Sequence, residues 1–426
     1  MANSYRDMIA AAEAAKNTGL DLSHYIEWLD SCVNHEFISA NVRSVEGQEA
    51  FDIIAGEKLR IASEKANQAA NSDVRFVNKS YRHLYAGGWF ASGVDPLANW
   101  EPMAWGQMKP DKPRWNSSKQ RFIKYEAPAA TGTRMLIPNV PFAVARKVVE
   151  RFNFGKPADY QLSLSELEMA CLWKEGGFWA WLIEHPEIPL LICEGAKKVG
   201  AAFCAGFPAI GLPGIWNGRQ AKPKDPETLK HWKPQLKDEL KMFAQPGRKI
   251  VFAFDADEKI ETQQKVWKAL EATAFLFLKD TRAQPYFASW EADDGKGIDD
   301  FIAANGQDAF AGIVAAAQSY EEWKIGCELA RELTRIPDLK INQKLIDIDL
   351  EALPKEGILA IVAPKGTGKT QHFLKPLVEA EDSMLLIGHL INLTKANSQR
   401  MSATYRSDLD RAAGRFINGD GELVYR

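Results

Sequence analysis

Three acidic residues stand directly after short apolar runs, where their side chains could hold a metal ion. Glu194 closes the run PLLIC, and Asp255 and Asp257 close the run KIVFAF. Residues two apart on an extended chain point to the same side, so the two aspartates can converge. Carboxylates that converge repel one another unless a cation intervenes, and oxygen ligands select hard cations such as Mg²⁺ or Mn²⁺. Such a cation can bind phosphates and offset the charge that develops during phosphoryl or nucleotidyl transfer.

Other charged residues in the same region extend this candidate site. Lys197 and Lys198 follow Glu194 closely and could face either phosphate or water. The later segment GKGIDDF contains Asp299 and Asp300, which could support the metal or cap a helix. The DxD pair itself has a structural alternative, because Asp often ends a strand and caps the following helix.

The elements that would position these residues can be predicted between about residues 186 and 305. Four short apolar runs bounded by Pro, Gly or charge predict strands: PLLICE, PAIGL, KIVFAFD and PYFASW. Apolar residues at helical spacing predict helices within 196–206 and 261–279. Alternating strands and helices predict an α/β fold with a parallel sheet covered on both faces. In such sheets, sites form at the carboxyl ends of strands, where the three acids lie.

The rest of the chain divides into regions that differ in sequence pattern and composition. Residues 1–185 are expected to form an N-terminal α+β domain, which is mainly helical to about residue 70. Residues 186–320 hold the α/β domain, residues 321–350 are predicted to be a linker, and residues 351–426 begin a P-loop unit. Four tryptophans gather in the N-terminal region and predict either a compact core or a binding surface: Trp89, Trp100, Trp105 and Trp115.

A basic and aromatic segment, KPDKPRWNSSKQRFIKY, follows these tryptophans closely. Cations meet phosphates and ring faces stack on bases, so this composition suits single-stranded nucleic acid. A solvated loop whose aromatic side chains pack inward would have the same composition. The candidate nucleic-acid contacts are Lys112, Arg114, Trp115 and Arg121, together with Lys197 and Lys198.

A glycine-rich loop follows a predicted buried strand in the last region. Residues 358–370 read ILAIVAPKGTGKT, a Walker A segment of the AxxGxGKT kind. Backbone N–H groups of such a loop cradle phosphates, while the lysine reaches the β- and γ-phosphates and the threonine helps to hold Mg²⁺. No later strand end offers a Walker B acid, and residues 351–426 are too few for a complete motor, so we expect ATP binding without hydrolysis. The expected nucleotide contacts are Lys365, Gly366, Thr367, Gly368, Lys369 and Thr370.

Composition narrows the class of protein without deciding its function. The 426 residues are too many for one typical core, and the hydrophobic content of 46% is ordinary for a globular protein. Five widely spaced cysteines without a CxxC pair argue against a zinc ribbon and against disulfides, and favour reduced thiols in the cytoplasm. The net charge of −3 means that contacts with nucleic acid must come from local basic patches or metal ions. No run approaches the roughly 18 apolar residues that a membrane span needs.

The succession LLICEG, VFAFDAD and GKGIDDFI resembles the Toprim fold shared by bacterial-type primases, topoisomerases and certain nucleases. The resemblance covers about residues 188–305 and implies a Rossmann-like parallel sheet. It implies that Glu194 is the acid of the first motif and that Asp255 and Asp257 form the metal-binding pair, with Asp299 as a further candidate ligand. Two features depart from the primase pattern: DADEKI lacks the glycine of DxDxAG, and no cysteine ribbon precedes the domain.

A Toprim-like unit followed by a Walker A loop resembles plasmid and phage primase–helicase proteins, and in particular the replication proteins of cyanobacterial plasmids. That resemblance implies metal-dependent primer synthesis on single-stranded DNA, joined to the start of a superfamily 2-like helicase. A Toprim-type nuclease would use the same carboxylates with water as the attacking group. A third hypothesis is a non-catalytic module that binds origin DNA or single-stranded DNA. New strands, shortened strands or unaltered DNA would separate the three.

Overall fold

The computed structural model divides the chain into two compact units, residues 1–324 and residues 325–426. The predicted domain boundary between residues 185 and 186 falls inside the first unit. The described residues are 5–66, 72–220, 234–257, 259–332, 339, 341, 345–350, 353, 359, 361, 363, 366–380, 396–397, 399–401, 410–412 and 415–417.

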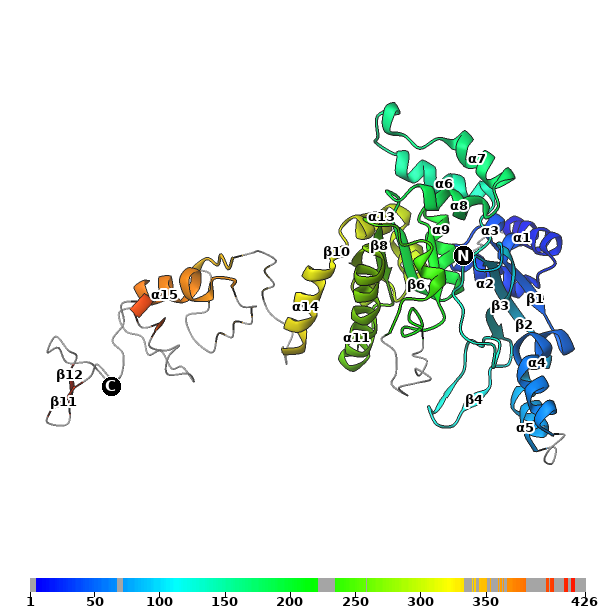
Figure 1. Cartoon of the computed structure of the whole chain (residues 1–426), viewed down its shortest axis with the longest axis horizontal. Coiled ribbons are helices and arrows are strands. Elements are labelled where there is room, and N and C mark those ends of the chain that lie inside the picture. Colours follow the sequence, from blue (N-terminus) through cyan, green and yellow to red (C-terminus); the bar gives the residue numbers. More distant parts are fainter. Residues whose placement is uncertain are drawn as a thin grey trace, which may run out of the picture. The chain divides into compact units, whose positions relative to one another are not determined.

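A five-stranded sheet forms the centre of the first unit (Figure 1), with the strand order β10-β9-β8-β6-β7. Four neighbouring strands run parallel, and β10 pairs antiparallel with β9 at one edge. Each parallel strand coincides with a predicted apolar run, so the predicted α/β class with a parallel sheet is confirmed. The strands are β6 Leu190–Glu194, β7 Ala209–Leu212, β8 Lys249–Ala253, β9 Gln284–Ala288 and β10 Gln318–Ser319.

Two crossover connections give this sheet a switch in strand order. α9 (Ala196–Cys204) connects β6 to β7, and α11 (Ile260–Leu276) lies between β8 and β9. The chain therefore moves from β6 toward one edge and from β8 toward the other, although β6 and β8 are neighbours. Because crossovers of this kind are right-handed, the two helices belong on opposite faces of the sheet. Ligand sites in such folds form where the order reverses, at the carboxyl ends of β6 and β8.

Shorter helical elements complete the parallel-sheet region. α9 ends as the sequence predicts, with Gly206 at a φ of +83° directly after its C-cap, a backbone conformation that favours glycine. Apolar residues of the α9 helix are buried on nearly every side, because α6 and α12 also pack on it. The other elements are α10 Asp238–Lys241, η3 Phe277–Thr281, η4 Ala292–Asp294, α12 Ile298–Asn305 and α13 Gln307–Ala315.

The N-terminal region combines helices with an antiparallel sheet of order β1-β2-β3. Its core joins the sheet to two helices through Phe51, Ile54, Tyr81 and Met108. The strands are β1 Val42–Val45, β2 Gly88–Asp95 and β3 Glu101–Pro110. The helical elements are α1 Tyr5–Thr18, α2 Leu22–Asp30, α3 His35–Asn41, α4 Gly47–Ala66, α5 Ser72–Tyr81 and η1 Arg82–Ala86.

Between the two sheets the chain forms a small hairpin and a helical group. The predicted cluster of tryptophans is divided, since Trp89 and Trp105 are buried in the core whereas Trp115 on the hairpin is half exposed. A binding role for Trp115 stays a prediction. The hairpin consists of β4 Trp115–Asn116 and β5 Arg121–Phe122, and the helical elements are α6 Phe142–Asn153, η2 Ala158–Tyr160, α7 Leu164–Trp173 and α8 Gly177–Glu184.

A backbone segment before α6 runs along the outer edge of β7. Leu136 and Gly211 exchange both of their backbone hydrogen bonds, each 2.9 Å long. The next carbonyl, that of Ile137, accepts a 2.8 Å hydrogen bond from the Val94 N–H of β2. The segment therefore connects the parallel sheet to the antiparallel sheet through the backbone.

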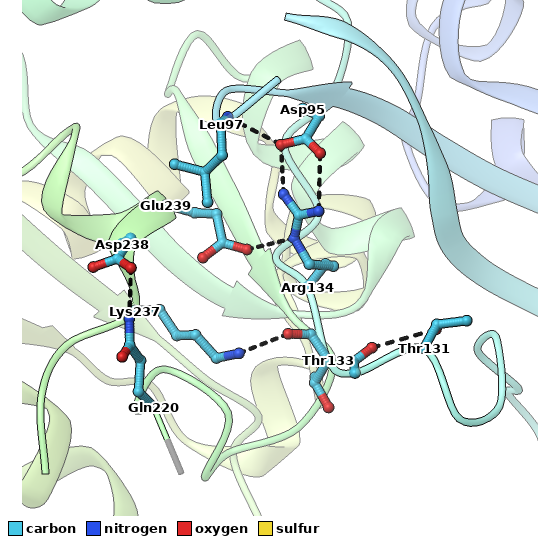
Figure 2. A network of polar contacts seen from close by, with 10 residues as sticks. Asp95, Leu97, Thr131, Thr133, Arg134, Gln220, Lys237, Asp238 and Glu239 are labelled. Carbon is cyan, nitrogen blue, oxygen red and sulfur yellow. Dashed lines mark hydrogen bonds and ion pairs between the residues drawn. The ribbon is translucent and has the colours of Figure 1, made fainter. Parts of the chain in front are cut away.

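An ionic contact reinforces this connection (Figure 2). The Arg134 guanidinium donates two hydrogen bonds to the Asp95 carboxylate at the end of β2 and one, 2.7 Å long, to Glu239 on α10. Arg134 accordingly holds the pKa of Asp95 below its usual range. On the neighbouring loop, Lys237 donates a 2.7 Å hydrogen bond from Nζ to the Thr133 carbonyl. Side chains as well as backbone thus fix the two sheets against each other.

The second unit is described only in segments. The predicted linker at 321–350 begins with regular structure instead, because α14 covers Tyr320–Glu332. Most of the predicted strand at 358–362 lies outside the described residues, as does the apolar run at 383–390. The other described elements are η6 Lys369–Leu374, α15 Lys375–Ala380, β11 Asp410–Ala412 and β12 Arg415–Ile417. Within the described parts of the chain, no helix is long and apolar enough to cross a membrane.

Arg248 is a buried cation that fixes the amino-terminal side of the sheet. It has no exposed surface, and its guanidinium donates hydrogen bonds to the carbonyls of Ile188 and Leu182 and to Oε1 of Gln245. Burial lowers the pKa of Arg248 to about 10. The side chain thereby holds the segment before β6, the end of α8 and the turn before β8 together.

We expect Arg248→Met to lower the free energy of unfolding by about 2 kcal/mol, because buried carbonyls lose their donors. Urea unfolding followed by circular dichroism would measure the change. Arg146→Met, which removes an exposed cation of α6, is the matched control and should leave the urea midpoint unchanged. Equal midpoints for wild type and Arg248→Met would show that these hydrogen bonds are not needed.

Candidate active site

The predicted acidic residues meet at the switch point of the parallel sheet. Glu194 is the last residue of β6, and Asp255 and Asp257 lie two and four residues after the end of β8. The two strands are paired in parallel with Ile192 opposite Phe252, so their next residues emerge at the same edge of the sheet. Residues about 60 positions apart in the sequence therefore share one small region.

The electrostatics of this region disfavour ionised carboxylates. Burial raises the pKa of Glu194, and the negative charges of Asp255 and Asp257 raise it further. Burial likewise raises the pKa of Asp255, although Lys198 acts in the opposite direction. Raised pKa values on neighbouring acids are typical of sites that handle charged ligands or metal ions.

Lys198 supplies the positive charge inside the site. It lies in the first turn of α9, and its Nζ is 3.3 Å from Oδ1 of Asp255. Burial alone would lower the pKa of Lys198, but the carboxylates of Asp255 and Asp299 hold it above its ordinary value. The lysine side chain passes so close to Gly297 that a Cβ at that position would lie 2.2 Å from its Cε. A side chain at 297 would therefore displace the end of Lys198 from its present position.

The GKGIDDF segment places its acids in two different roles. Asp300 accepts a 3.3 Å hydrogen bond from the Gly297 N–H at the start of α12, so it caps this helix. Asp299 is buried on the side of Lys198, and its Oδ1 accepts no hydrogen bond from any described residue. In the same segment, Lys296 has its Nζ 3.8 Å from Oδ1 of Asp257. Lys296 was not among the predicted site residues, although it belongs to the GKGIDDF segment.

The chemistry of the donors fits a hard divalent cation. Oδ1 of Asp299 is buried and accepts no hydrogen bond among the described residues, and Oδ1 of Asp255 is buried with Lys198 as its ion-pair partner. Carboxylate oxygens are the ligands that Mg²⁺ and Mn²⁺ prefer. Among those residues, no three His, Cys, Asp or Glu side chains are already grouped as a complete metal site. Lys198 pairs with Asp255 at the position where a cation would be needed. The assignment of Glu194, Asp255, Asp257 and Asp299 as metal ligands stays a prediction.

A side chain of the antiparallel sheet closes one side of this region. Gln107 on β3 accepts a 2.8 Å hydrogen bond through Oε1 from the Ala196 N–H, the first N–H of α9. Gly195 before it has a φ of +93°, and a Cβ there would approach Gln107 to 3.5 Å. A small cavity beside this contact is lined by Gln107, Gly195 and Tyr125, among others. Nothing in the local sequence identifies Gln107, which is 89 positions away from its partner.

Of the predicted nucleic-acid contacts, the two lysines after Gly195 point in different directions. Lys198 faces the acids, whereas Lys197 donates a 3.0 Å hydrogen bond to Glu27, which also pairs with Lys109 at 2.8 Å. Glu27 thereby joins α2, β3 and α9. Lys197 is held by this acid in the structure, and its contact with DNA stays a prediction.

The hairpin presents some of its predicted contacts to solvent. Trp115 and Phe122 are 50% and 56% exposed and pack edge to face with ring centroids 5.0 Å apart. Lys112 and Arg121 are also exposed. Arg114 differs, because it donates two hydrogen bonds to the buried Glu126. The structure thus gives Arg114 a supporting role at the base of the hairpin.

Two glycines of the predicted Walker A loop lie in left-handed backbone conformations. Gly366 and Gly368 have φ values of +85° and +76°, which favour glycine. Lys369 donates a 2.5 Å hydrogen bond from Nζ to the Ala363 carbonyl, and Thr370 lies in the helical turn that follows. Lys365 lies outside the described residues. The predicted binding of ATP by this loop is not tested by these contacts.

Comparisons with known proteins found similarity that includes the acidic region. The family model described as a domain of unknown function (DUF3854) matches residues 178–309. An uncharacterised protein of Picosynechococcus sp. (strain ATCC 27264 / PCC 7002 / PR-6) is 32% identical over 414 residues. That alignment covers 96% of this chain but 39% of the relative, so this chain spans well under half of the relative's length.

Two solved structures are also similar to this chain. The structure of a DnaG primase catalytic domain bound to ssDNA is 13% identical, with a TM-score of 0.39, and the match covers 89% of this chain and 88% of that one. The zinc-binding and RNA polymerase domains of the Aquifex aeolicus primase are 13% identical, with a TM-score of 0.32, and the match covers 76% and 70% of the two chains. Both TM-scores are below 0.5, so the function proposed below rests on the site and the sequence motifs.

The raised pKa of Glu194 leads to a test of the site by stability. Ionisation of Glu194 destabilises the folded state, because the pKa of this carboxyl is higher in the folded protein than in the unfolded protein. This penalty is absent below about pH 4 and grows as the pH rises through the folded-state pKa. Glu194→Gln removes the charge, so in EDTA the variant should melt at a higher temperature than wild type at pH 7 and at the same temperature below about pH 4.

Thermal melts across this pH range, with and without Mg²⁺, would measure the effect. Glu168→Gln, which changes an exposed acid on α7, should melt like wild type at each pH. Mg²⁺ should raise the melting temperature of wild type more than that of Glu194→Gln. A Glu194→Gln protein that is less stable than wild type at pH 7 in EDTA would contradict the electrostatic description.

Proposed function

We propose that this chain is a DNA-replication protein that synthesises primers on single-stranded DNA by metal-dependent nucleotidyl transfer. The observation that carries the proposal is the meeting of Glu194 and Asp255, both with raised pKa values, around the ammonium of Lys198 at the switch point of the sheet. Repulsion between the acids and attraction to one cation make this a place where positive charge is required. The Toprim-like order of motifs in the sequence supports the same assignment.

Each residue of the site would have its own role in binding a nucleoside triphosphate. Glu194, Asp255 and Asp257 would bind Mg²⁺ or Mn²⁺, and the ion would offset the charge that develops on the transferred phosphoryl group. Lys198 would leave Asp255 when the ion binds and would then contact phosphate, since its stem already reaches the site. Lys296, near Asp257, lies in a position to contact another phosphate oxygen. Gln107 would hold the Gly195 turn, and with it the direction of Glu194.

Exposed rings and cations on the hairpin support single-stranded DNA as the template. Trp115 and Phe122 offer ring faces to solvent, and base stacking on an aromatic ring tolerates any sequence. Lys112 and Arg121 are exposed nearby and would contact the backbone phosphates. Arg114 would act indirectly, by holding the base of the hairpin against Glu126.

The Walker A loop supports a second, separate role in nucleotide binding. The glycine conformations at 366 and 368 suit a loop that wraps phosphate, and Lys369 would turn from the Ala363 carbonyl to the ligand. We propose that this loop binds ATP as the start of a helicase-like unit. Hydrolysis is not part of the proposal for this chain.

Primer synthesis should depend on Asp255. Template-dependent incorporation of labelled nucleotides on single-stranded DNA, with Mg²⁺ or Mn²⁺, should give new oligonucleotides with wild type. Asp255→Ala should reduce this synthesis by at least about a hundredfold, as expected for removal of a residue that stabilises charge in the reaction. Asp293→Ala, which changes an exposed acid outside the site, is the control and should keep full activity.

The products would also distinguish primer synthesis from other uses of the site. Shortened template without new strands would identify a nuclease and would overturn the primase proposal. Full synthesis by a folded Asp255→Ala protein would disprove the assignment of the site. If the wild-type protein binds DNA but neither extends nor cuts it, the chain is a non-catalytic binding module.

Binding of single-stranded DNA should depend on the hairpin. Trp115→Ala should weaken the binding of an oligo-dT roughly fivefold to tenfold, because stacking contributes about 1 kcal/mol or more per base. Fluorescence anisotropy with a labelled oligonucleotide would measure this. Phe76→Ala removes another exposed aromatic side chain, on α5, and should have no effect. Equal losses for the two variants would exclude a specific role for the hairpin.

A further inference from the structure

A second pocket lies on the α11 side of the parallel sheet, away from the carboxylates. It has a volume of about 480 Å³, a size typical of sites for small ligands. Its walls come from α11, from the loop after β7 and from the start of α14. All of the residues used below belong to the first unit.

The pocket carries an excess of positive charge. Its lining includes four cations and one acid, which are Arg219, Lys268, Lys279, Lys324 and Glu271. Glu271 pairs with Lys324 at 3.4 Å. Among the described residues, Arg219 and Lys268 have no carboxylate within ion-pair distance, and Nε of Arg219 is buried without a hydrogen-bond acceptor.. Burial lowers the pKa of Arg219. A bound anion would give Arg219 and Lys268 a negatively charged partner and would give Nε of Arg219 a hydrogen-bond acceptor.

Aromatic side chains accompany the cations. Phe275 lines the pocket and is 53% exposed, which is unusual for a large apolar side chain on a packed helix. Tyr320 also lines the pocket. The Arg219 guanidinium lies 4.6 Å from the ring centroid of Trp216, and this contact orients it. Cations next to an exposed ring match a ligand that has both phosphate and a flat base.

The described residues next to Arg219 are held by contacts with other elements. Its backbone pairs with Leu236, whose N–H donates a 3.1 Å hydrogen bond to Asp280. Gln220 beside it donates to Asp238, as Figure 2 shows. Gly218 packs so closely on α11 that a Cβ there would lie 2.7 Å from Cγ2 of Thr273. The described part of this wall is therefore held by contacts within the protein.

The pocket is too far from the carboxylates to be part of the same site. α11 begins three residues after Asp257, and the pocket lies against its second half and the turn that follows. At a rise of about 1.5 Å per residue, Lys268 is roughly 12 Å and Phe275 roughly 22 Å along the helix from its first residue. A nucleotide held at the acids could not also fill this pocket.

We propose that this pocket is a second binding site for a nucleotide, with its phosphates on Arg219 and Lys268 and its base against Phe275. The nucleotide can come from two sources, a free nucleoside triphosphate or one unit of a single-stranded DNA chain. Both present the same combination of phosphate and ring. Binding there does not require the acids of the active site or the Walker A lysine.

The test uses the full chain with Asp255→Ala and Lys369→Ala in EDTA, so that neither of the other two nucleotide sites contributes. Fluorescence anisotropy would follow a labelled ATP analogue and, separately, a labelled oligo-dT. Lys268→Glu should weaken one or both ligands about tenfold, because it replaces a charge-assisted contact by repulsion. Lys265→Glu makes the same change at an exposed position of α11 outside the pocket and should have little effect.

Each outcome decides the proposal. A specific effect of Lys268→Glu on ATP identifies a free nucleotide as the ligand, and an effect on oligo-dT alone identifies a DNA chain. Phe275→Ala, an exposed position that should not disturb folding, should weaken ATP but not inorganic triphosphate, which has no ring. The proposal is overturned if neither ligand distinguishes Lys268→Glu from Lys265→Glu, or if neither binds.

Discussion

The site depends on one constraint: the carboxylates of Glu194 and Asp255 lie close together in a partly buried region. Burial and the charge of Asp255 disfavour ionisation of Glu194, and burial disfavours ionisation of Asp255. Lys198 on α9, 3.3 Å from Asp255, partly offsets these effects. Gly297 leaves room for that lysine, and α12 brings Asp299 to its other side. Lys198 therefore supplies the positive charge that these acids need in the structure.

The N-terminal region helps to position the site, although Glu194, Asp255 and Asp257 all lie outside it. Gln107 reaches across from the antiparallel sheet to the first N–H of α9, and Glu27 binds Lys197 on the same helix. The Arg134 contacts keep the two sheets in a fixed relation. The residues that complete the site therefore come from a region whose sequence alone shows no catalytic motif, which explains why the first compact unit contains both parts.

The parts of the fold that could be predicted are those set by short stretches of sequence. The four parallel strands are continuous apolar runs, and a residue at the end of such a run must lie at the edge of the sheet, so Glu194 and Asp255 were placed correctly. Contacts between distant residues could not be predicted, because periodicity says nothing about partners. Gln107 is one example, and the pairing of Arg114 with Glu126 is another, since a basic segment looks the same whether its cations are free or paired.

The antiparallel exchange between Leu136 and Gly211 has a consequence for how this protein behaves in a crowded cell. An exposed edge strand offers unpaired N–H and C=O groups that can recruit a strand from another molecule. By pairing with Gly211 at 2.9 Å in both directions, Leu136 occupies part of that edge of β7, and the short β10 ends the sheet on its other side. The segment that connects the two sheets therefore also makes part of the β7 edge inaccessible to a strand from another molecule.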